Sequence, residues 1–306
     1  MRFAIPVNAP FELLPLKESG ADEFYCGFQD ESWSRTYGTH DSLTRRQDGA
    51  NFTDWGLFSE TLRESDRLGL PLSLTLNGRY TSGQLPEILR LAERYEDAGG
   101  KRVILRSPTL ASFLRDTSLS VTVSLLASCL NASAARYWVS LGADRIVLPR
   151  ELSPDDMKTI ARCVPDCEYE AMIFDDNCRF SDGCCRCIHG ASLPARQDDV
   201  PAEREIFSYD LSGCAHHLCL DGSHSSHGCG ACALEELSQA GVAVGKLGGR
   251  GTPLSHRLEA LAFFRKAAAL PPEERPSLHE KLFGVCRCYY AREGDRYGKM
   301  CLSAKA

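Results

Sequence analysis

Residues 144–173, DRIVLPRELSPDDMKTIARCVPDCEYEAMI, contain one complete strand–helix–strand unit, and this unit decides the fold. The apolar runs at residues 144–148 and 168–173 predict two buried strands. Between them, Ser153 is a suitable N-cap, and two aspartates follow it where the helix dipole favours negative charge. Strands that alternate with helices in this way form a parallel sheet.

The same alternation continues in both directions along the chain. The other strands are expected at residues 3–7, 23–26, 71–76, 102–105, 119–123 and 242–246. Helices are expected between them, at residues 10–19, 54–69, 84–98, 109–115, 131–141, 231–240 and 254–269. Eight strands interleaved with helices predict an α/β fold of the (β/α)8 TIM-barrel type, and a doubly wound open sheet is the alternative.

Two long segments depart from this alternation. Residues 28–53 read as a polar connection after the second strand, and residues 178–232 form a cysteine-rich insertion after the seventh. Both would face the barrel mouth, because the loops that follow barrel strands share one face. Residues 1–270 are therefore expected to form the barrel, with residues 271–306 as a proline-marked linker and a short cysteine-containing tail. That tail either folds back on the mouth or frays.

Composition limits the classes of function. A chain of 306 residues with net charge −6 has no global basic field, so extended nucleic-acid binding is not indicated, although a local basic site remains open. We find neither a signal peptide pattern nor an apolar run of about 18 residues, so we expect a cytoplasmic protein. In a reducing cytosol the 15 cysteines would remain thiols or bind metal.

The cysteine-rich insertion predicts a metal site. It contains eight cysteines and five histidines, and thiolates select iron–sulfur clusters or zinc. The pairs Cys214-x4-Cys219 and Cys229-x2-Cys232 let two sulfurs reach one centre from a short loop. By contrast, the cysteines of the barrel segments are expected to be small buried residues rather than ligands: Cys26, Cys129, Cys163 and Cys167.

Polar residues at the predicted strand ends are the candidate catalytic and substrate-binding groups. The catalytic candidates are Arg150, Glu151, Lys246 and Arg250, and the substrate-binding candidates are Arg35, Asn77 and Ser124. For Arg150 and Glu151 the structural alternative is a salt bridge that closes the barrel. Lys246 and Arg250 flank a glycine-rich turn and would hold an anionic substrate.

Several motifs, in this order, resemble those of peptidase family U32, the collagenase-like group whose catalytic type its name leaves unknown. The family signature, an acidic residue followed by Cys-x4-Gly-x-Cys, is met by Glu170, Cys178, Gly183 and Cys185. Further matches are Tyr25-Cys26-Gly27, Thr75-Leu76-Asn77, Ser124, Asn131, the run LPRELS at 148–153, and KLGGR at 246–250. The chain departs from the family at Gly248, where a glutamate is usual, and after Cys185, where a serine is usual. It therefore resembles a divergent, short branch.

The resemblance implies a barrel with one of two chemistries. Some relatives are described as proteases of collagen-like chains. Others resemble oxygen-independent hydroxylases that carry a 4Fe-4S cluster on four cysteines and modify ubiquinone precursors, or RNA bases with prephenate as the apparent oxygen source. By position, Cys178 and Cys185 match the first two cluster ligands, and Cys229 and Cys232 are the candidates for the others. The reserve ligands are Cys187, Cys214, Cys219, Cys286, Cys288 and Cys301.

Three functions are weighed on these grounds. The first is an iron–sulfur redox or hydroxylation enzyme that acts on a small anionic or RNA-derived substrate. The second is a U32-type protease, although no local Cys–His pairing is marked and no His-Glu-x-x-His helix occurs. The third is a non-catalytic binding protein stabilised by zinc at a closed site. A homo- or hetero-oligomer is left open, since some relatives work as paired proteins.

Overall fold

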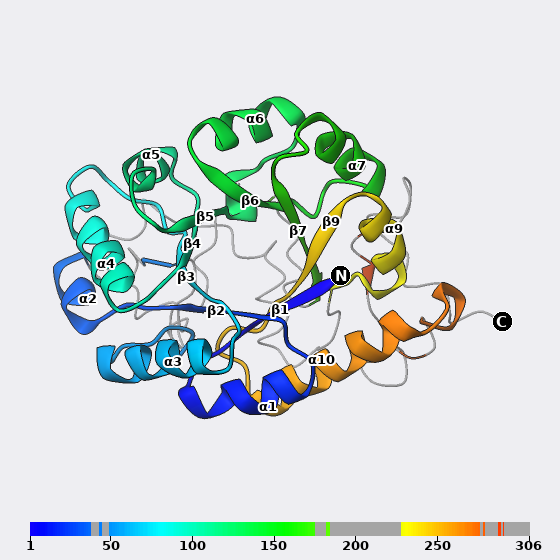
Figure 1. Cartoon of the computed structure of the whole chain (residues 1–306), viewed down its shortest axis with the longest axis horizontal. Helices are drawn as coiled ribbons and strands as arrows, with labels where there is room; N and C mark the ends of the chain where they lie inside the picture. The colour runs from blue at the N-terminus through cyan, green and yellow to red at the C-terminus, as the bar shows by residue number, and fades with distance from the viewer. Residues whose placement is uncertain are drawn as a thin grey trace, which may run out of the picture.

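A ring of parallel strands surrounded by helices forms the body of the protein (Figure 1). The computed structural model describes residues 1–37, 43–44, 49–174, 182–183, 228–275, 278, 287–288 and 290. Within them, the barrel strands are β1 (Arg2–Pro6), β2 (Glu23–Gly27), β3 (Leu72–Leu76), β4 (Arg102–Leu105), β5 (Ser120–Val123), β6 (Ala143–Leu148), β7 (Glu168–Phe174) and β9 (Val242–Leu247). Strand β9 pairs in parallel with both β7 and β1, which closes the barrel. The predicted (β/α)8 fold is confirmed, and the open-sheet alternative is wrong.

Helices connect the strands and cover the barrel from outside (Figure 1). They are α1 (Leu13–Glu18), α2 (Glu31–Tyr37), α3 (Trp55–Arg67), α4 (Leu85–Asp97), α5 (Pro108–Leu114), α6 (Ala132–Ser140), α7 (Pro154–Cys163), α9 (Leu234–Gln239) and α10 (Leu254–Ala269). Short 3-10 turns are η1 (Pro10–Glu12), η2 (Leu125–Ala127), η6 (Ala231–Ala233) and η7 (Pro272–Glu274). Among the described helices, none is long and apolar enough to cross a membrane.

Side-chain caps explain where several helices begin. Ser153 accepts a hydrogen bond from the backbone N–H of Asp156, and the Asp156 carboxylate accepts one from the backbone N–H of Ser153, which is a complete capping box. Asp54 and Asn131 accept hydrogen bonds from the third residue of α3 and α6 in the same way. These caps fix the direction in which each helix leaves the preceding strand-end loop.

The connection after β2 is more ordered than the sequence indicated. Helix α2 occupies Glu31–Tyr37, because Trp33 is buried and its ring packs 4.5 Å from that of Tyr37. Phe28 and Phe52, on either side of this connection, form an isolated parallel bridge. The polar connection expected over residues 28–53 thus contains a helix that the sequence analysis did not predict, while residues 38–42 and 45–48 lie outside the described residues.

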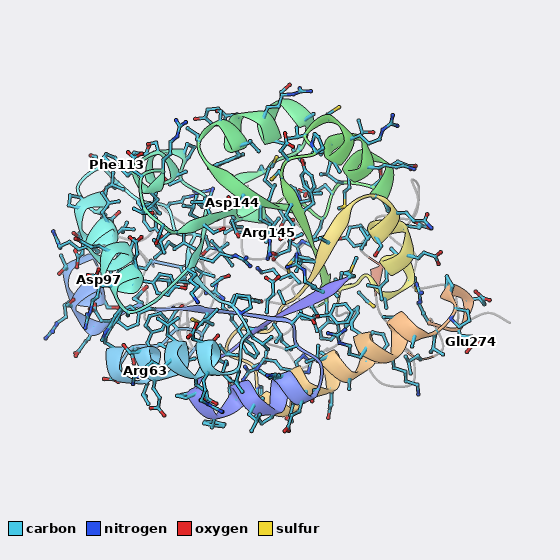
Figure 2. All side chains as sticks on the ribbon, in the orientation of Figure 1. Arg63, Asp97, Phe113, Asp144, Arg145 and Glu274 are labelled. Carbon is cyan, nitrogen blue, oxygen red and sulfur yellow. The ribbon has the colours of Figure 1, made fainter. Side chains whose placement is uncertain are left out.

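The inside of the barrel carries charge, whereas its outer layer is apolar. Arg145 on β6 donates to Glu23 on β2 at 2.7 and 3.0 Å and to Glu170 on β7 at 3.0 Å, and all three side chains are buried. Figure 2 shows Arg145 toward the middle of the molecule, while Asp97 and Phe113 lie on the outer helices. A buried ion-pair network therefore occupies part of the barrel interior, where aliphatic side chains are usual.

The insertion follows β7 as expected, and its last residues return to the barrel. Strand β8 (Gly228–Cys229) pairs antiparallel with the end of β7, through Phe174 and Cys229. The tail also returns, because β10 (Arg287–Cys288) pairs in parallel with β8. Most of the predicted ligands lie outside the described residues: Cys178, Cys185, Cys187, Cys214, Cys219, Cys286 and Cys301.

Candidate active site

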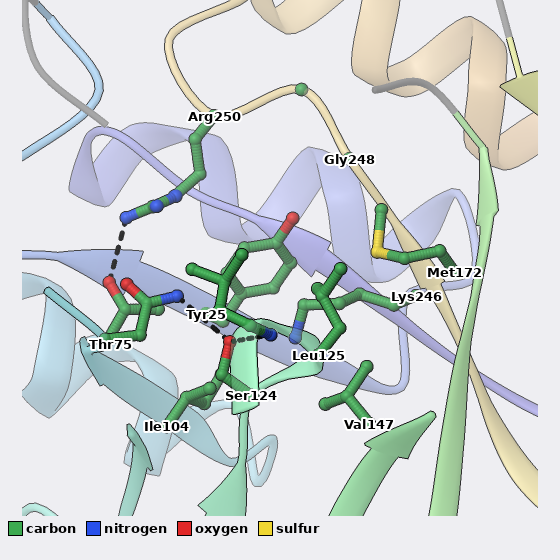
Figure 3. A pocket seen from close by; sticks show the side chains of 13 residues that line it. Tyr25, Thr75, Ile104, Ser124, Leu125, Val147, Met172, Lys246, Gly248 and Arg250 are labelled. Carbon is green, nitrogen blue, oxygen red and sulfur yellow. Dashed lines mark hydrogen bonds between the residues drawn. The ribbon is translucent and has the colours of Figure 1, made fainter. Parts of the chain in front are cut away.

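A pocket opens at the C-terminal ends of the strands, where barrel chemistry is expected. Figure 3 shows that its polar side chains come from different strands, with Thr75 on β3, Lys246 on β9 and Arg250 just beyond β9. Asn77 and Ser124 also line it. Its apolar lining consists of Ile104, Leu125, Leu126, Val147 and Met172. Cationic and amide groups thus meet in a largely apolar cavity, which suits a small anionic or planar ligand.

Lys246 is held at one wall of the pocket by Glu170. Its Nζ donates to Glu170 Oε1 at 2.7 Å and lies 4.1 Å from the ring centroid of Tyr25. The Tyr25 hydroxyl in turn donates to the carbonyl of Leu247 at 2.6 Å. Burial and the nearby Arg145 and Arg250 lower the pKa of Lys246, against the pull of Glu170. Burial alone would raise the pKa of Glu170, but Lys246 and Arg145 lower it below its usual value.

Arg250 crosses the mouth of the pocket toward β3 (Figure 3). Its Nη1 donates to Thr75 Oγ1 at 2.8 Å, and the Thr75 hydroxyl donates to the carbonyl of Cys26 at 2.9 Å. Gly27 permits this arrangement, because a Cβ there would lie 2.0 Å from Asn51 Oδ1 and 2.8 Å from Arg250 Nη1. The glycine at the end of β2 therefore makes room for the guanidinium.

Asn77 and Ser124 meet across the pocket floor. The Asn77 amide donates to Ser124 Oγ at 3.3 Å, and the same oxygen accepts from the backbone N–H of Leu126 at 3.3 Å. Ser124 thereby caps η2, so its hydroxyl is oriented by an amide and a backbone group. The two residues predicted separately from strand ends are brought together as one polar pair.

Arg150 and Glu151 contact the short stretch Asp182–Gly183 rather than the pocket lining. Arg150 donates to the Asp182 carboxylate from its backbone N–H at 2.9 Å, from Nε at 3.1 Å and from Nη2 at 2.5 Å. Glu151 Oε1 accepts from the backbone N–H of Asp182 at 2.7 Å. Burial raises the pKa of Asp182, and the Arg150 contacts oppose that rise. These two residues therefore anchor the signature segment to the loop after β6.

Asp182 and Gly183 also contact two other loops, those that carry Arg79 and Ser128. Arg79 donates to the carbonyl of Gly183 at 3.3 Å, and Ser128 donates to the carbonyl of Asp182. The φ of Gly183 is +87°, and a Cβ there would lie 2.4 Å from the carbonyl oxygen of Leu126. Glycine is thus required at this signature position, both by its backbone conformation and by close contact. Cys185 follows two residues later in the sequence.

Cys229 lies beside the pocket strands, and its sulfur accepts a backbone hydrogen bond. It is 2% exposed, and its Sγ accepts a hydrogen bond from the backbone N–H of Ala231 at 3.4 Å. Phe174 is the register partner of both Cys229 on β8 and Leu247 on β9. The backbone of Cys229 is therefore separated by one strand from that of the residue following Lys246.

The remaining cysteines of the barrel differ from this pattern. Burial raises the pKa of Cys26 and Cys167 to about 12 and that of Cys129 to about 11, as expected for unreactive packed thiols. Cys163 is exposed at the end of α7, so the expectation that it is buried is wrong. Within the described part of the chain, no group of three or more His, Cys, Asp or Glu side chains is arranged to hold a metal ion.

Sequence reasoning assigned no site role to Tyr25, Thr75 or Asp182 and quoted Glu170 only as part of a motif. A signal was present for Glu170. It is an acid in the apolar end of a predicted strand, so its buried charge required a cationic partner such as Lys246. Conversely, Arg35 is exposed on α2 and is not among the described residues that line the pocket.

Comparison with known proteins supports the resemblance to peptidase family U32 that the sequence motifs indicated. The family model described as Peptidase family U32 matches residues 12–282. The chain belongs to peptidase family U32. Two positions of the family signature have structural roles here. Glu170 accepts a hydrogen bond from Lys246, and Gly183 has the backbone conformation that the anchored segment requires. Gly248, where the family usually has a glutamate, lines the pocket.

Individual relatives of this U32 protein match part of its length. The tRNA hydroxylation protein P of Escherichia coli is 25% identical over 126 residues, which cover 40% of this chain and 28% of that protein. The protein of the same name from Helicobacter pylori is 29% identical over 183 residues, covering 58% and 39%. The chain thus spans well under half the length of these curated relatives. Among solved structures, the U32 peptidase Mk0906 aligns with a TM-score of 0.44 and 16% identity over 56% of this chain and 68% of that one.

Proposed function

We propose that this U32 protein is a hydroxylation-type enzyme that binds an iron–sulfur cluster and acts on a small anionic or RNA-derived substrate. The observation that carries the proposal is the pairing of Phe174 with both Leu247 and Cys229. It places the pocket of Lys246 and Arg250 close to Cys229, a buried cysteine at the end of the cysteine-rich insertion. The matching relatives named tRNA hydroxylation protein P support the same class of reaction.

Of the four proposed ligands, Cys229 and Cys232 lie among the described residues, and the contacts of Cys229 are compatible with a thiolate-held cluster. A buried thiolate is stable when it coordinates metal and accepts N–H donors, and Cys229 accepts the N–H of Ala231. Cys232 follows in the same Cys-x2-Cys spacing, and the anchored Asp182–Gly183 stretch lies between Cys178 and Cys185 in the sequence. These four cysteines would hold the cluster. When bound, such a cluster supplies electron transfer at a potential set by its surroundings.

The pocket residues bind and orient the substrate. The planar guanidinium of Arg250 offers paired donors to a carboxylate or phosphate, and Thr75 fixes its position. Glu170 accepts a hydrogen bond from Lys246 and so directs this side chain along the pocket wall. The Asn77 side chain lines the pocket and can form hydrogen bonds with a polar edge of the ligand. The apolar lining excludes water from the rest of the ligand.

In this proposal Arg150 and Glu151 are positioning residues. They hold Asp182, which lies between Cys178 and Cys185 in the sequence. Their contacts to Asp182 favour this role over the catalytic one expected from the sequence. Their replacement should therefore affect metal content before it affects substrate binding.

One experiment addresses both parts of the proposal. The chain is expressed in Escherichia coli cells that lack tRNA hydroxylation protein P, and iron and sulfide are measured on the protein purified without oxygen. Nucleosides from the cellular tRNA are then compared by mass spectrometry with those from cells carrying empty vector. We expect a cluster, together with a nucleoside that has gained one oxygen atom. A cluster-loaded protein without that nucleoside would exclude this RNA substrate, and a protein without iron and sulfide would exclude the cofactor.

A further inference from the structure

A lysine amine lies inside the pocket, although lysine side chains are rarely buried. Lys246 is 6% exposed, and its side chain extends from β9 into the cavity that Tyr25 and Met172 also line (Figure 3). By contrast, the side chain of Lys101 is 74% exposed and pairs with Asp66 at the surface. Burial of an ammonium group costs free energy of desolvation, and lysines placed in this way commonly act through their amine.

The surroundings of Lys246 determine how firmly its amine holds a proton. Burial has the largest influence and favours the neutral amine, as do the positive charges of Arg145 and Arg250. The Glu170 carboxylate opposes them, because it accepts a hydrogen bond from Nζ at 2.7 Å. The net effect places the pKa of Lys246 below its usual value. Arg145 holds the other oxygen of Glu170 at 3.0 Å, so the oxygen that faces Lys246 is fixed where it can accept the amine's proton.

The same pocket contains groups that suit a carboxylate and a carbonyl. Arg250 lines it, and its Nη1 is fixed by a hydrogen bond to Thr75 at 2.8 Å. A guanidinium forms paired hydrogen bonds with a carboxylate. The Asn77 amide and the Ser124 hydroxyl, 3.3 Å apart, line the pocket as well and are groups that can hydrogen-bond a carbonyl oxygen. A small ligand held by its carboxylate would therefore share the cavity with the amine of Lys246.

We propose that Lys246 is an amine nucleophile that forms an imine with an oxo acid, whose carboxylate is held by Arg250. The inference rests on the anion-binding part of the proposed function and adds a covalent step to the same pocket. A lysine is activated for this step by desolvation and by neighbouring cations, which are the conditions around Lys246.

The step balances with the groups in the pocket. Glu170 takes one proton from the ammonium, and the neutral amine attacks the carbonyl carbon, so that a C–N bond forms and the π electrons move to oxygen. A proton passes from nitrogen to that oxygen. The resulting hydroxyl then takes the proton back from Glu170 and leaves as water, which gives a protonated C=N bond. No oxidant or reductant is consumed.

Trapping of the imine tests the inference on the wild-type protein. The full chain, purified without oxygen, is incubated with pyruvate and sodium cyanoborohydride, which reduces an imine to a stable amine. Peptide mass spectrometry then locates the adduct, which we expect on Lys246. Acetone is the matched ligand control, because it has the carbonyl group without the carboxylate. The exposed Lys101 is the internal control for non-specific reaction and should remain unmodified.

Two variants separate the nucleophile from the group that holds the carboxylate. Lys246→Arg keeps a cation beside Glu170 but has no nucleophilic amine, so the adduct at this position should be lost while the circular dichroism spectrum is retained. Arg250→Met keeps the amine, and at limiting pyruvate it should form about 10-fold less adduct or lower still, because a charged hydrogen bond to the carboxylate is missing.

Each result decides a different part of the inference. The absence of an adduct on Lys246 in the wild type, or equal labelling of Lys246 and Lys101, would overturn it and leave the proposed function standing. Equal labelling of Lys246 by pyruvate and acetone would overturn the oxo acid as the substrate class. A specific pyruvate adduct on protein that lacks iron and sulfide would support the inference, whereas the iron–sulfur part of the proposed function would fall.

Discussion

The Nζ of Lys246 lies 2.7 Å from Oε1 of Glu170, and the two side chains are 8% and 1% exposed. Arg145 contacts the other carboxylate oxygen at 3.0 Å, so Glu170 is shared between two cations inside the barrel. Removing one partner of a buried pair leaves the other charge unpaired in a medium that solvates it poorly. The pair therefore links the stability of the barrel to the shape of the pocket.

We expect Glu170→Gln to lower the free energy of unfolding by about 3–5 kcal/mol, the usual consequence of breaking a buried ion pair. Glu168→Gln is the control, because Glu168 lies on the same strand and also contacts Arg145, but its side chain is 33% exposed. Urea unfolding followed by circular dichroism measures both. Equal losses in the two variants would contradict the argument from burial.

The pH dependence of this loss has a defined sign. Lys246 and Arg145 hold the pKa of Glu170 below its usual value in spite of burial, so its carboxylate stabilises the fold above the unfolded pKa of about 4.3. That contribution is lost as the pH falls through the lower folded pKa. The difference in unfolding free energy between wild type and Glu170→Gln should thus be constant near neutral pH and narrow below about pH 4.3. A difference that widens with acidification would show that Glu170 is protonated in the folded protein.

The anchored signature segment allows a test with a matched glycine. Gly183 has φ +87° and a Cβ there would meet the carbonyl of Leu126, whereas Gly99 has φ +93° with nothing within 4 Å. An alanine in either place bears the left-handed penalty of about 1–2 kcal/mol, but only Gly183→Ala adds a clash. We expect faster amide exchange of the peptide containing Asp182 in Gly183→Ala and no change there in Gly99→Ala. Hydrogen–deuterium exchange measured by mass spectrometry decides this, and wild-type protection in Gly183→Ala would show that the anchor tolerates a Cβ.

Much of the fold follows from local pattern. The strands and most helices lie within one or two residues of their predicted ranges, because apolar runs alternate with capped helices such as that after Ser153. Helix α2 was missed, since its order depends on Trp33 packing against Tyr37 and not on a periodic apolar face. A periodic pattern of apolar residues predicts which segments are buried, but a single buried aromatic pair produces no such pattern.

Four of the candidate residues could be placed at strand ends from the sequence, but their contacts could not be predicted. Lys246, Arg250, Asn77 and Ser124 were found from their places at strand ends, and all of them line the pocket. Which of them meet depends on closure of the barrel, as with Arg250 and Thr75, which are 175 positions apart. The Arg150–Asp182 contact likewise depends on the insertion folding back, which no spacing in the sequence specifies.

Substrate binding should depend on Arg250 without involving the metal. If its guanidinium holds an anionic group, Arg250→Met removes a charged hydrogen bond worth about 1.5–3 kcal/mol. The KM for tRNA from cells lacking the modification should then rise about 10–100-fold. Thr75→Val keeps the guanidinium and removes only its 2.8 Å partner, so a smaller increase is expected. Iron and sulfide content should match the wild type in both variants, and a variant that loses metal would assign Arg250 to the cluster instead.

Metal binding should distinguish Cys229 from another buried cysteine of the barrel. Cys229 and Cys167 are both nearly inaccessible, but Cys229 accepts the N–H of Ala231, while burial raises the pKa of Cys167 to about 12. The Cys229 sulfur accepts a hydrogen bond, as a metal-bound sulfur can, whereas Cys167 donates to the carbonyls of Asp144 and Glu168 and is held as a neutral thiol. Cys229→Ser should therefore lose the bound metal, whereas Cys167→Ser should retain it with at most a small change in thermal stability. Metal analysis and thermal unfolding, both on protein purified without oxygen, measure these effects. Serine nearly matches cysteine in size. Metal loss in Cys229→Ser without loss of secondary structure would therefore assign the effect to the missing sulfur. Retention of full metal content in Cys229→Ser would remove this cysteine from the ligand set.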